Sequence, residues 1–578
     1  MTLRKKYILL ALILILILLS LALLDSHSHA IPLRFSTGPG FYQEPFPLEL
    51  ISDFGYEIHY TMDGSEPTLD SRLYTEPILI SDLSSKENRY ACRDDISAGF
   101  RKDLIEQVAE KRPDEEVVPS NYAVPDYPVD KCSVVRATAF LDGEAVASLT
   151  GSYFVGFQQK HTYDTVKVVS LVTDPDNLFD YKTGIYVTGA ALDQAIDKLG
   201  EEPEPGEESI PFEWAFWPAN YQFRGRDWER PAYIQVFGED RQLQLEDGCG
   251  IRTQGGVSRG YAQKNLSIFA RREYSGKDTF SSSLFAEGTE PHKFLLFTGS
   301  NDNLFKLQDA IVSTLVQGLD FAAMTYTPCV LFLNGEFWGT YYLTESYNEK
   351  YIQDHYGVQP GNIIMIKSDE VEEGEPSGLD IYHEMVYFIG ENDMTLRENY
   401  MKALEWMDMD SYTDYYAAEI YIGRYNDWPN LNEAAWRSKS IRLSSASDNF
   451  EDGKWRWMLF DVNGYGLTAD LIYTDTLAET REVCAMFDSL CRNPDFQKLL
   501  AQKLRYMAQE VFTEEACQSY LNGYLETMLD PLCASNRRFY GEDCREEILQ
   551  NVRNTADFFR QRADYVDTMI VTNFGEGI

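Results

Sequence analysis

The sequence has little positive charge. Its 578 residues contain 51 Lys and Arg against 92 Asp and Glu, which gives a formal net charge of −41. Nucleic-acid binding needs a basic surface, and anionic lipid also attracts basic segments, so the body of the chain is not expected to bind either. Hydrophobic residues make up 44% and aromatic residues 13%. That content supports a large core and excludes an acidic disordered tail.

Several catalytic motifs are also missing. The seven histidines form no H-E-x-x-H pattern, and neither a G-x-S-x-G elbow nor a Walker A loop occurs. None of the nine cysteines forms a C-x-x-C pair, which disfavours zinc and thioredoxin-like sites. Cys92 could pair with Cys132, and Cys484 with Cys491, while buried free thiols are the alternative. A carboxylate pair for glycoside hydrolysis could lie among the many acids.

The longest apolar run lies at the N-terminus. Residues 7–24 follow three basic residues, 4–6, and at 1.5 Å per residue they span about 27 Å, close to the hydrocarbon thickness of a bilayer. The basic flank predicts a cytoplasmic N-terminus. The run is either a retained signal-anchor or a signal peptide cleaved after Ala30, so residues 1–30 form the targeting segment. Both interpretations place residues 31–578 outside the cytoplasm, either anchored on the membrane or secreted.

Residues 31–157 are predicted to form a small all-β module. Strand-like runs separated by turn residues occur at 48–50, 57–61, 78–80, 134–140 and 151–155. Residues 60–68, Tyr-Thr-Met-Asp-Gly-Ser-Glu-Pro-Thr, together with 73–74 and 77–78, resemble the chitobiase/β-hexosaminidase C-terminal-type module. That resemblance implies a β-sandwich that acts as a spacer or contacts carbohydrate. A polar insertion, 84–131, interrupts it.

From about residue 166 to residue 575 the pattern predicts a mixed α+β domain. Residues 328–333 and 337–343 flank Asn334-Gly335 and predict a β-hairpin. The other expected elements are strands at 166–172, 184–187, 233–237, 249–253 and 265–270 and helices at 303–319, 496–512, 514–529 and 546–571. Two acidic segments, 201–209 and 369–375, are expected to be solvated loops.

The sharpest chemical pattern is the spacing D-x-x-x-x-N formed by Asp427 and Asn432. In a protein-kinase catalytic loop, the Asp at this spacing orients or deprotonates the attacking hydroxyl and the Asn binds a metal ion. An Asx-turn cluster is the structural alternative. The strand predicted at 454–460 ends at Asp461, beside Gly464, which is how kinases place a Mg²⁺-binding carboxylate.

Upstream lies a glycine-rich turn between two strands. It runs from Arg252 through Ser258 and Arg259, and Lys264 follows it. Backbone N–H groups and these side chains could surround phosphates, although a plain hairpin has the same composition. Further along, the strand 340–345 ends at Glu345 in a manner like a kinase hinge, which contacts adenine through backbone groups.

Taken in order, these motifs resemble the bacterial spore-coat CotH kinase family over residues 166–570. The quoted segments are 252–264, 332–345, 426–432 and 457–466. The resemblance implies an α+β fold with a two-lobed atypical protein-kinase-like domain and a helical C-terminal part, preceded by the sandwich and an apolar anchor helix. It implies the use of ATP and Mg²⁺ to phosphorylate Ser or Thr of proteins.

Carried over residue by residue, the resemblance assigns roles. Asp427 would be the catalytic Asp, and Asn432 and Asp461 would be metal ligands. Lys264 would contact nucleotide phosphate, and the further nucleotide-binding candidates are Arg252, Ser258, Arg259 and Glu345. The family often has Asp-x-Asp where this chain has Asp461-Val462-Asn463. The acidic partner of the lysine is not evident, and Asp309 is a guess for it.

The negative charge predicts an acceptor protein whose Ser or Thr lies near basic residues. One alternative is a catalytically weak or inactive surface scaffold or carbohydrate-binding protein on the same fold. Another is a transferase that moves a nucleotidyl or aminoacyl group.

Overall fold

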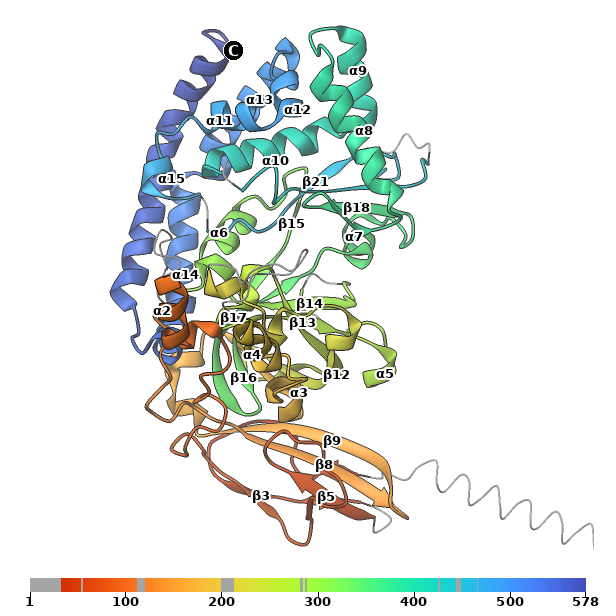
Figure 1. Ribbon diagram of the computed structural model, residues 1–578, viewed down its shortest axis with the longest axis vertical. Coiled ribbons are helices and arrows are strands. Elements are labelled where there is room, and N and C mark those ends of the chain that lie inside the picture. The colour runs from red at the N-terminus through yellow and green to blue at the C-terminus, as the bar shows by residue number, and fades with distance from the viewer. Residues whose placement is uncertain are drawn as a thin grey trace, which may run out of the picture.

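The computed structural model describes residues 33–52, 56–111, 120–198, 213–280, 284–285, 288–424, 427–442, 449–464 and 466–578. The apolar run 7–24, the cleavage position after Ala30 and the acidic segment 201–209 lie outside these residues. Within them, no helix is both long and apolar enough to cross a bilayer. Along the long axis, Figure 1 shows the N-terminal sheets at one end, a barrel in the middle and a helical part with another sheet at the far end.

The N-terminal sheets form a sandwich with one core. The larger sheet has the order β2-β9-β8-β5-β6, and β1-β4 and β3-β7 form two small sheets. The strands are β1 Arg34–Phe35, β2 Gly40–Tyr42, β3 Phe46–Leu48, β4 Leu50–Ile51, β5 Glu57–Thr61, β6 Arg72–Leu73, β7 Ile78–Ile80, β8 Ser133–Leu141 and β9 Glu144–Val155. Alternate residues such as Val135 and Ala137 of β8 enter the core. The strands predicted at 57–61, 78–80, 134–140 and 151–155 are confirmed.

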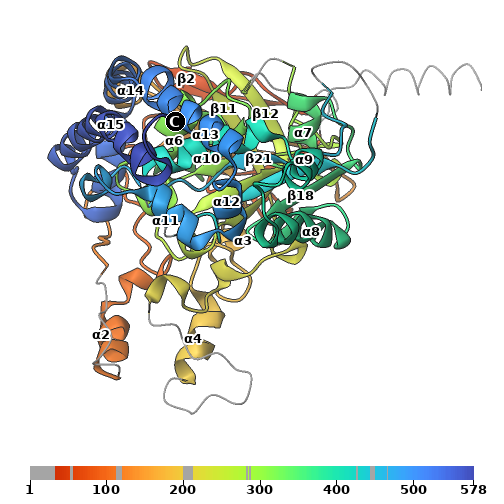
Figure 2. The ribbon, with the colours of Figure 1, turned by 90° about the horizontal axis from the view of Figure 1, so that it is seen from above.

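The insertion between β7 and β8 packs on the next domain. It contains α2, Lys102–Lys111, whose apolar face meets Leu192 of α4, Gly189–Asp197, and Trp217. Figure 2 shows α2 and α4 projecting together from the body of the molecule. The buried carboxylate of Glu336 accepts hydrogen bonds from the backbone N–H groups of Arg89, Tyr90 and Ala91 at 2.6, 2.9 and 2.7 Å. The insertion is therefore fixed to the tip of the β16–β17 hairpin.

The middle of the molecule is a closed barrel with the order β10-β11-β12-β13-β14-β17-β16. Its strands are β10 Lys167–Val172, β11 Arg230–Phe237, β12 Leu243–Gln254, β13 Asn265–Phe269, β14 Lys293–Phe297, β16 Tyr326–Leu333 and β17 Glu336–Glu345. The strand predicted at 184–187 is wrong. There the N–H groups of Ile185 and Tyr186 bond to carbonyls of α3, Pro175–Phe179, rather than to a strand. The apolar run is buried as an irregular segment.

The predicted hairpin is confirmed, and its turn explains why. Asn334 and Gly335 have φ values of 47° and 88°, the positive pair that a two-residue type I′ turn requires. By contrast, the helix predicted at 303–319 is shorter, since α6 covers only Gln308–Leu315. The buried carboxylate of Asp302 accepts the N–H groups of Leu307 and Gln308 and so fixes the start of α6.

The C-terminal part combines a sheet with helices, which confirms a mixed α+β chain with a helical C-terminal part. The sheet order is β15-β21-β20-β18-β19, with β15 Ala322–Ala323, β18 Ile363–Lys367, β19 Glu370–Glu373, β20 Ala434–Ser438 and β21 Arg456–Leu459. The helices are α7 Glu349–Tyr356, α8 Ser377–Glu391, α9 Arg397–Trp406, α10 Met409–Ile422, α11 Thr476–Val483, α12 Ala485–Leu490, α13 Pro494–Tyr506, α14 Glu514–Tyr540 and α15 Arg545–Phe574.

The structure differs from two expectations drawn from the sequence, one about the acidic segment 369–375 and one about the cysteines. The acidic segment 369–375 is not simply a loop, because β19 lies within it and pairs with β18. All nine cysteines fall within the described residues, and all are free thiols. The pairs considered from sequence, Cys92 with Cys132 and Cys484 with Cys491, are therefore not formed.

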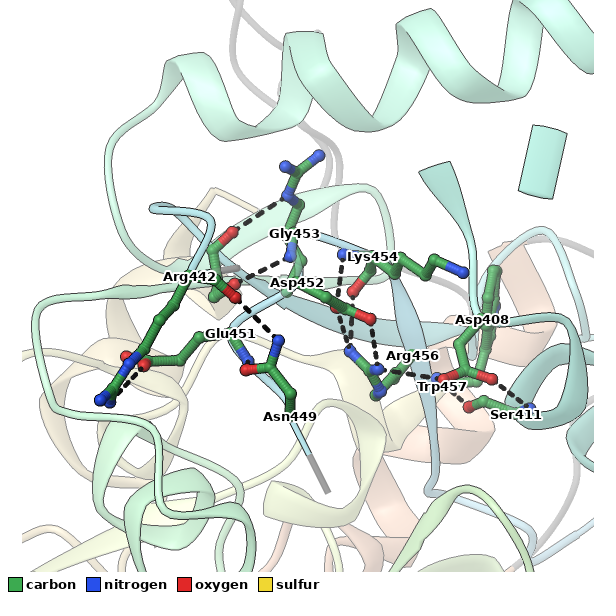
Figure 3. Close-up of polar contacts among 12 residues, drawn as sticks. Asp408, Ser411, Arg442, Asn449, Glu451, Asp452, Gly453, Lys454, Arg456 and Trp457 are labelled. Atoms are coloured by element: carbon green, nitrogen blue, oxygen red, sulfur yellow. Dashed lines mark hydrogen bonds and ion pairs between the residues drawn. The ribbon is translucent and has the colours of Figure 1, made fainter. Parts of the chain in front are cut away.

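Polar contacts fix β21, the strand that leads to Asp461. Arg456 bonds both carboxylate oxygens of Asp452 at 2.9 Å and lies 3.0 Å from Asp408, and the N–H of Trp457 donates to Ser411 Oγ, as Figure 3 shows. Asp408 and Ser411 belong to the start of α10. Strand β21, which precedes Asp461, is thus bonded to the start of helix α10, which precedes Asp427.

Candidate functional site

The loop between α10 and β20 brings Asp427 and Asn432 together. Asp427 Oδ2 accepts Asn432 Nδ2 at 2.7 Å and Arg424 Nη2 at 2.7 Å, and the Asp427 carbonyl accepts the N–H of Asn432 at 3.0 Å. The other carboxylate oxygen, Oδ1, is buried and has no hydrogen-bond partner among the described residues. One oxygen is fixed, and the other is left to receive a ligand.

A buried ion pair stands behind Asp427. Arg424 is fully buried and lies 3.4 Å from Glu419 on α10. Burial raises the pKa of Glu419 to about 7, against the opposing effect of Arg424. Burial alone would lower the pKa of Arg424, but Glu419 and Asp427 together raise it above its usual value. The guanidinium of Arg424 therefore remains charged and lies directly beside the Asp427 carboxyl.

Asp461 lies in a tight turn after β21, with φ of 57°. Asn463 Oδ1 accepts the N–H of Asn301 at 2.9 Å, so its Nδ2 must be the group that meets Asp461 Oδ1, also at 2.9 Å. A backbone N–H can only donate, which settles the orientation of this amide. Asn463 orients Asp461 and does not present its oxygen to the site.

Side chains in the first turn of helix α6 also bind the segment that follows Asp461. Gln308 Oε1 accepts the N–H of Gly464 at 2.8 Å, and Asp309 Oδ1 accepts the N–H of Val462 at 3.0 Å. Burial, with the carboxylate of Asp461 nearby, raises the pKa of Asp309 to about 7. The guess that Asp309 pairs with Lys264 is wrong, because Asp309 faces the Asp461 turn instead.

The loop of Asp427 and the turn of Asp461 are neighbours. The N–H of Leu467 donates to the carbonyl of Ile422 at 3.0 Å, at the end of α10. A side chain at Gly466 would meet Ile422 O at 2.8 Å and Arg424 Cγ at 3.4 Å. Both of the predicted metal ligands, Asn432 and Asp461, therefore come from segments packed on the C-terminal end of one helix.

Lys264 lies beneath the glycine-rich turn. Its Nζ donates to the carbonyls of Arg259 and Tyr261 at 2.6 and 2.7 Å and lies 3.7 Å from the ring centroid of Tyr221. Burial lowers the pKa of Lys264 well below its usual value. In this arrangement the lysine holds the turn from inside, and its contact with nucleotide phosphate stays a prediction.

Arg259 and Ser258 lie on the turn itself. Arg259 is buried, its Nε and Nη1 have no hydrogen-bond partner among the described residues, and its Nη2 meets Thr253 O at 3.4 Å. Burial, with Arg224 and Arg252 nearby, lowers the pKa of Arg259 to about 10. Ser258 Oγ accepts Asn265 Nδ2 at 3.3 Å. Among the described residues Arg224, Arg252 and Arg259 form no ion pair, although Glu229 lies near Arg252, and such a group suits an anion such as phosphate.

Asn301 links the turn to the Asp461 side. Its Oδ1 accepts the hydroxyl of Tyr261 at 2.9 Å, while its N–H donates to Asn463. The nucleotide-binding candidates on the barrel and the metal-ligand candidates on the helical part therefore meet through one residue.

Glu345 stands apart from these groups. Its carboxylate bonds His355 Nε2 at 2.7 Å and Thr325 Oγ1 at 3.1 Å. Neither residue belongs to the predicted site, so the hinge-like role of this strand end also stays a prediction.

A cluster of cations was missed from the sequence. Burial, with Lys367 and Arg252 nearby, lowers the pKa of Lys293 to about 8, opposed by Glu372 and Glu373. Lys367 Nζ lies 4.2 Å from the ring centroid of Phe460, the residue before Asp461. A lysine that ends an apolar strand, as in Ile-Ile-Met-Ile-Lys, is the signal that could have identified Lys367.

A cavity of about 490 Å³ adjoins this cluster. That volume lies within the roughly 300–1,000 Å³ typical of sites for small molecules and cofactors. Its lining includes Phe269, Arg271, Lys293, Asn348, Lys350 and Glu373. The cavity has the size for a nucleotide, its lining mixes cations with the acids Asp278, Glu349 and Glu373, and none of the predicted site residues lines it.

The residues present fit a divalent cation that a nucleotide helps to hold. Within the described residues no group of three or more His, Cys, Asp or Glu could hold a metal ion. Mg²⁺, however, needs only one or two carboxylates when phosphates and water complete its shell. The carboxylate of Asp461 and the side-chain oxygen of Asn432, whose Nδ2 donates to Asp427, are the groups that would hold the ion.

Comparison with known families agrees with this geometry. The chain matches the CotH kinase protein family over residues 251–566 and the chitobiase/beta-hexosaminidase C-terminal domain over residues 37–96. No curated protein matches it. Because the first match covers more than half of the sequence, the chain belongs to the CotH kinase family. Both resemblances found in the sequence are confirmed.

Proposed function

We propose that the chain is an Mg²⁺- and ATP-dependent protein kinase that transfers the γ-phosphate to Ser or Thr of an acceptor protein. Membership of the CotH kinase family supports a kinase-like phosphotransferase. The observation that carries the proposal is Asp427, which has Oδ2 fixed by Arg424 and Asn432 and Oδ1 free among the described residues.

Each part of the site has a task in this chemistry. Asp427 Oδ1 would accept the proton of the attacking hydroxyl, and Arg424 holds that carboxylate in place. Asp461 and Asn432 would hold Mg²⁺, which neutralises phosphate charge when it is bound. Arg252, Arg259, Lys293 and Lys367 would meet the nucleotide as an anion. Positioning and electrostatics account for most catalysis of phosphoryl transfer, and these residues supply both.

The test is incubation of the purified protein with γ-labelled ATP, Mg²⁺ and candidate acceptor proteins. We expect Asp427→Asn and Asp461→Asn to lower transfer at least 100-fold, because each removes a group on which the transition state depends. Asp470→Asn, an exposed acid on η9 Ala469–Leu471, is the control. Full transfer by either site variant would refute the proposal, and a nucleotidyl or aminoacyl adduct in the mass spectrum would replace it.

A second cavity supports a basic acceptor. It has a volume of about 270 Å³ and lies beside the Asp427 loop, lined in part by Ile366, Tyr382, Tyr387, Pro429 and Glu433. This is below the roughly 300 Å³ at which small-molecule sites begin, so it suits one side chain. An apolar wall with a carboxylate at its floor matches the aliphatic stem and charged head of Lys or Arg.

Glu433 carries the charge of this cavity. Its carboxylate accepts hydrogen bonds from Tyr382 at 2.6 Å, Tyr416 at 2.9 Å and Trp457 Nε1 at 3.0 Å. Burial raises the pKa of Glu433 above its usual value, and the three neutral donors oppose that effect by stabilising the carboxylate. Oε2 takes one donor where Oε1 takes two, which leaves room for a further donor on Oε2.

We therefore expect Glu433→Gln to reduce the preference for a Ser peptide containing Lys over its norleucine analogue about tenfold, because a charge-assisted contact is lost. The ratio of kcat/KM for the two peptides measures it. Glu384→Gln, an exposed acid on α8, should leave the ratio unchanged. An unaltered ratio in a folded Glu433→Gln protein would contradict this role.

The second candidate function is a scaffold or carbohydrate-binding protein with little or no turnover. It is favoured by Asn463, which stands where the family often has Asp, and by the sandwich module, which matches an accessory domain of carbohydrate-active enzymes. Mg²⁺-dependent stabilisation of the protein by ATP would argue against it. The proposed location is outside the cytoplasm, on the membrane through residues 7–24 or secreted after cleavage at Ala30.

A further inference from the structure

Asp309 is a buried acid whose second oxygen has no hydrogen-bond partner. It is 4% exposed, Oδ1 accepts the N–H of Val462, and Oδ2 has no partner in hydrogen-bonding geometry among the described residues, although the side-chain amide of Asn463 lies beside this carboxyl. A buried carboxylate oxygen without a donor is costly, because it has lost its hydration without replacement. Such an atom in a native protein calls for a ligand.

The atoms around Asp309 point to a cation. Val462, which donates to Asp309, follows Asp461 directly, and Asn463 Nδ2 holds Asp461 Oδ1 from the other side. The carboxyl groups of Asp309 and Asp461 are thus held close together by hydrogen bonds to the segment 461–463. Like charges repel in a buried site, and either a proton on one of them or a cation between them relieves that repulsion. Within the described residues, no lysine, arginine or histidine forms an ion pair with Asp309 or Asp461.

We propose that Asp309, in the first turn of α6, is a carboxylate ligand of a divalent-cation site shared with Asp461. This inference rests on the proposed function. Asn463 cannot supply the second carboxylate, because it has an amide and its oxygen is used by Asn301. Asp309 supplies that carboxylate from a different element. A hard cation such as Mg²⁺ or Mn²⁺, with oxygen ligands only, is the chemistry that fits.

The test is Mn²⁺ binding to the full chain, measured by electron paramagnetic resonance without nucleotide or acceptor, with Mg²⁺ as competitor. We expect Asp309→Asn to weaken Mn²⁺ binding at least tenfold, as Asp461→Asn should, because each removes a charged ligand. Asp470→Asn should bind like the wild type. An affinity of Asp309→Asn within twofold of wild type would overturn the proposal.

Thermal unfolding in metal-free buffer gives a second readout. Asn fits the same space and keeps the acceptor for Val462, and it removes the repulsion of Asp461. The metal-free Asp309→Asn protein should therefore melt at or above the wild-type temperature, which a merely structural acid would not produce. A clear loss of stability or an unfolded protein would overturn the proposal.

The two hypotheses can fail separately. Mn²⁺ binding that depends on Asp309, without any phosphoryl transfer, would refute the proposed function and uphold the site. Transfer by the wild type, with Mn²⁺ binding indifferent to Asp309, would refute only the site.

Discussion

At the scale of single residues, the site is built from buried charges in unfavourable surroundings. Lys264 is stripped of water beneath the turn, Arg259 has two nitrogens without partners among the described residues, and Asp309 faces another acid. Perturbed ionisable groups cluster at functional sites, because binding or catalysis needs them more than stability does. A nucleotide phosphate and a metal ion would supply the missing partners of Arg259 and Asp309, so we expect these ligands to stabilise the folded protein.

Lys293 is expected to make the affinity of the site for nucleotide depend on pH. With its pKa lowered to about 8, the side chain is protonated below that pH and neutral above it. Its attraction for nucleotide is therefore present at pH 7 and lost as the pH rises through 8. Wild-type affinity for a non-hydrolysable ATP analogue should fall over this window, and Lys293→Met should lose about tenfold affinity at pH 7, about 1.4 kcal/mol.

Lys293→Arg separates charge from shape. Arginine stays protonated at every pH used, so this variant should keep its affinity up to pH 9. Fluorescence titration between pH 6.5 and 9.5 measures the curves, with the exposed residue change Lys182→Met as control. If the arginine variant loses affinity at the same pH as the wild type, another group controls the titration.

At the scale of elements, the sequence predicted correctly those features that depend only on neighbouring residues. The β16–β17 hairpin followed from Asn334-Gly335, whose positive φ values belong to the turn itself. The segment 184–187 has the composition of a strand, but it packs on α3 where no partner strand is available. Likewise α6 begins only at Gln308, because the carboxylate of Asp302, the residue just before the predicted helix, accepts the N–H groups of Leu307 and Gln308. Tertiary contacts explain both differences between prediction and structure, and the hydrophobic periodicity of the sequence does not reveal such contacts.

The candidate site shows the same division. Asp427 and Asn432 could be paired from spacing alone, because a loop with only four residues between them brings Asn432 Nδ2 to 2.7 Å from Asp427 Oδ2. Lys293 and Lys367 could not, because they lie on strands of two different sheets and meet only when the barrel packs on the helical part. The role of Asp309 depends in turn on the orientation of the Asn463 amide, which only hydrogen-bond partners reveal.

At the scale of the whole molecule, the sandwich module is not merely tethered by a linker. Its insertion is joined to the barrel through Glu336, which accepts three backbone N–H groups, and through the bond from Cys132 N to Gly335 O at 2.8 Å. The hairpin tip therefore acts as the joint between module and barrel. The module should move with the barrel as one body.

Glu336→Ala tests the joint. It would leave the N–H groups of Arg89, Tyr90 and Ala91 without an acceptor, at about 1–3 kcal/mol for each of the two that are buried, Tyr90 and Ala91. We expect a lower first unfolding transition and faster proteolytic cleavage between residues 84 and 131, with the cut mapped by mass spectrometry. Glu370→Ala, an exposed acid on β19, is the control. Unchanged cleavage would show that other contacts hold the module.

The sheet edges have a consequence for crowded conditions. β10 pairs with β16, so the barrel has no open strand along which a second chain could add. The five-stranded sheet of the C-terminal part ends at β15, only two residues long, and at β19, whose sequence Glu-Val-Glu-Glu carries three carboxylates. Acids along an open edge repel the same edge of another copy. Part of the excess negative charge thus lies where it keeps densely packed copies from joining edge to edge.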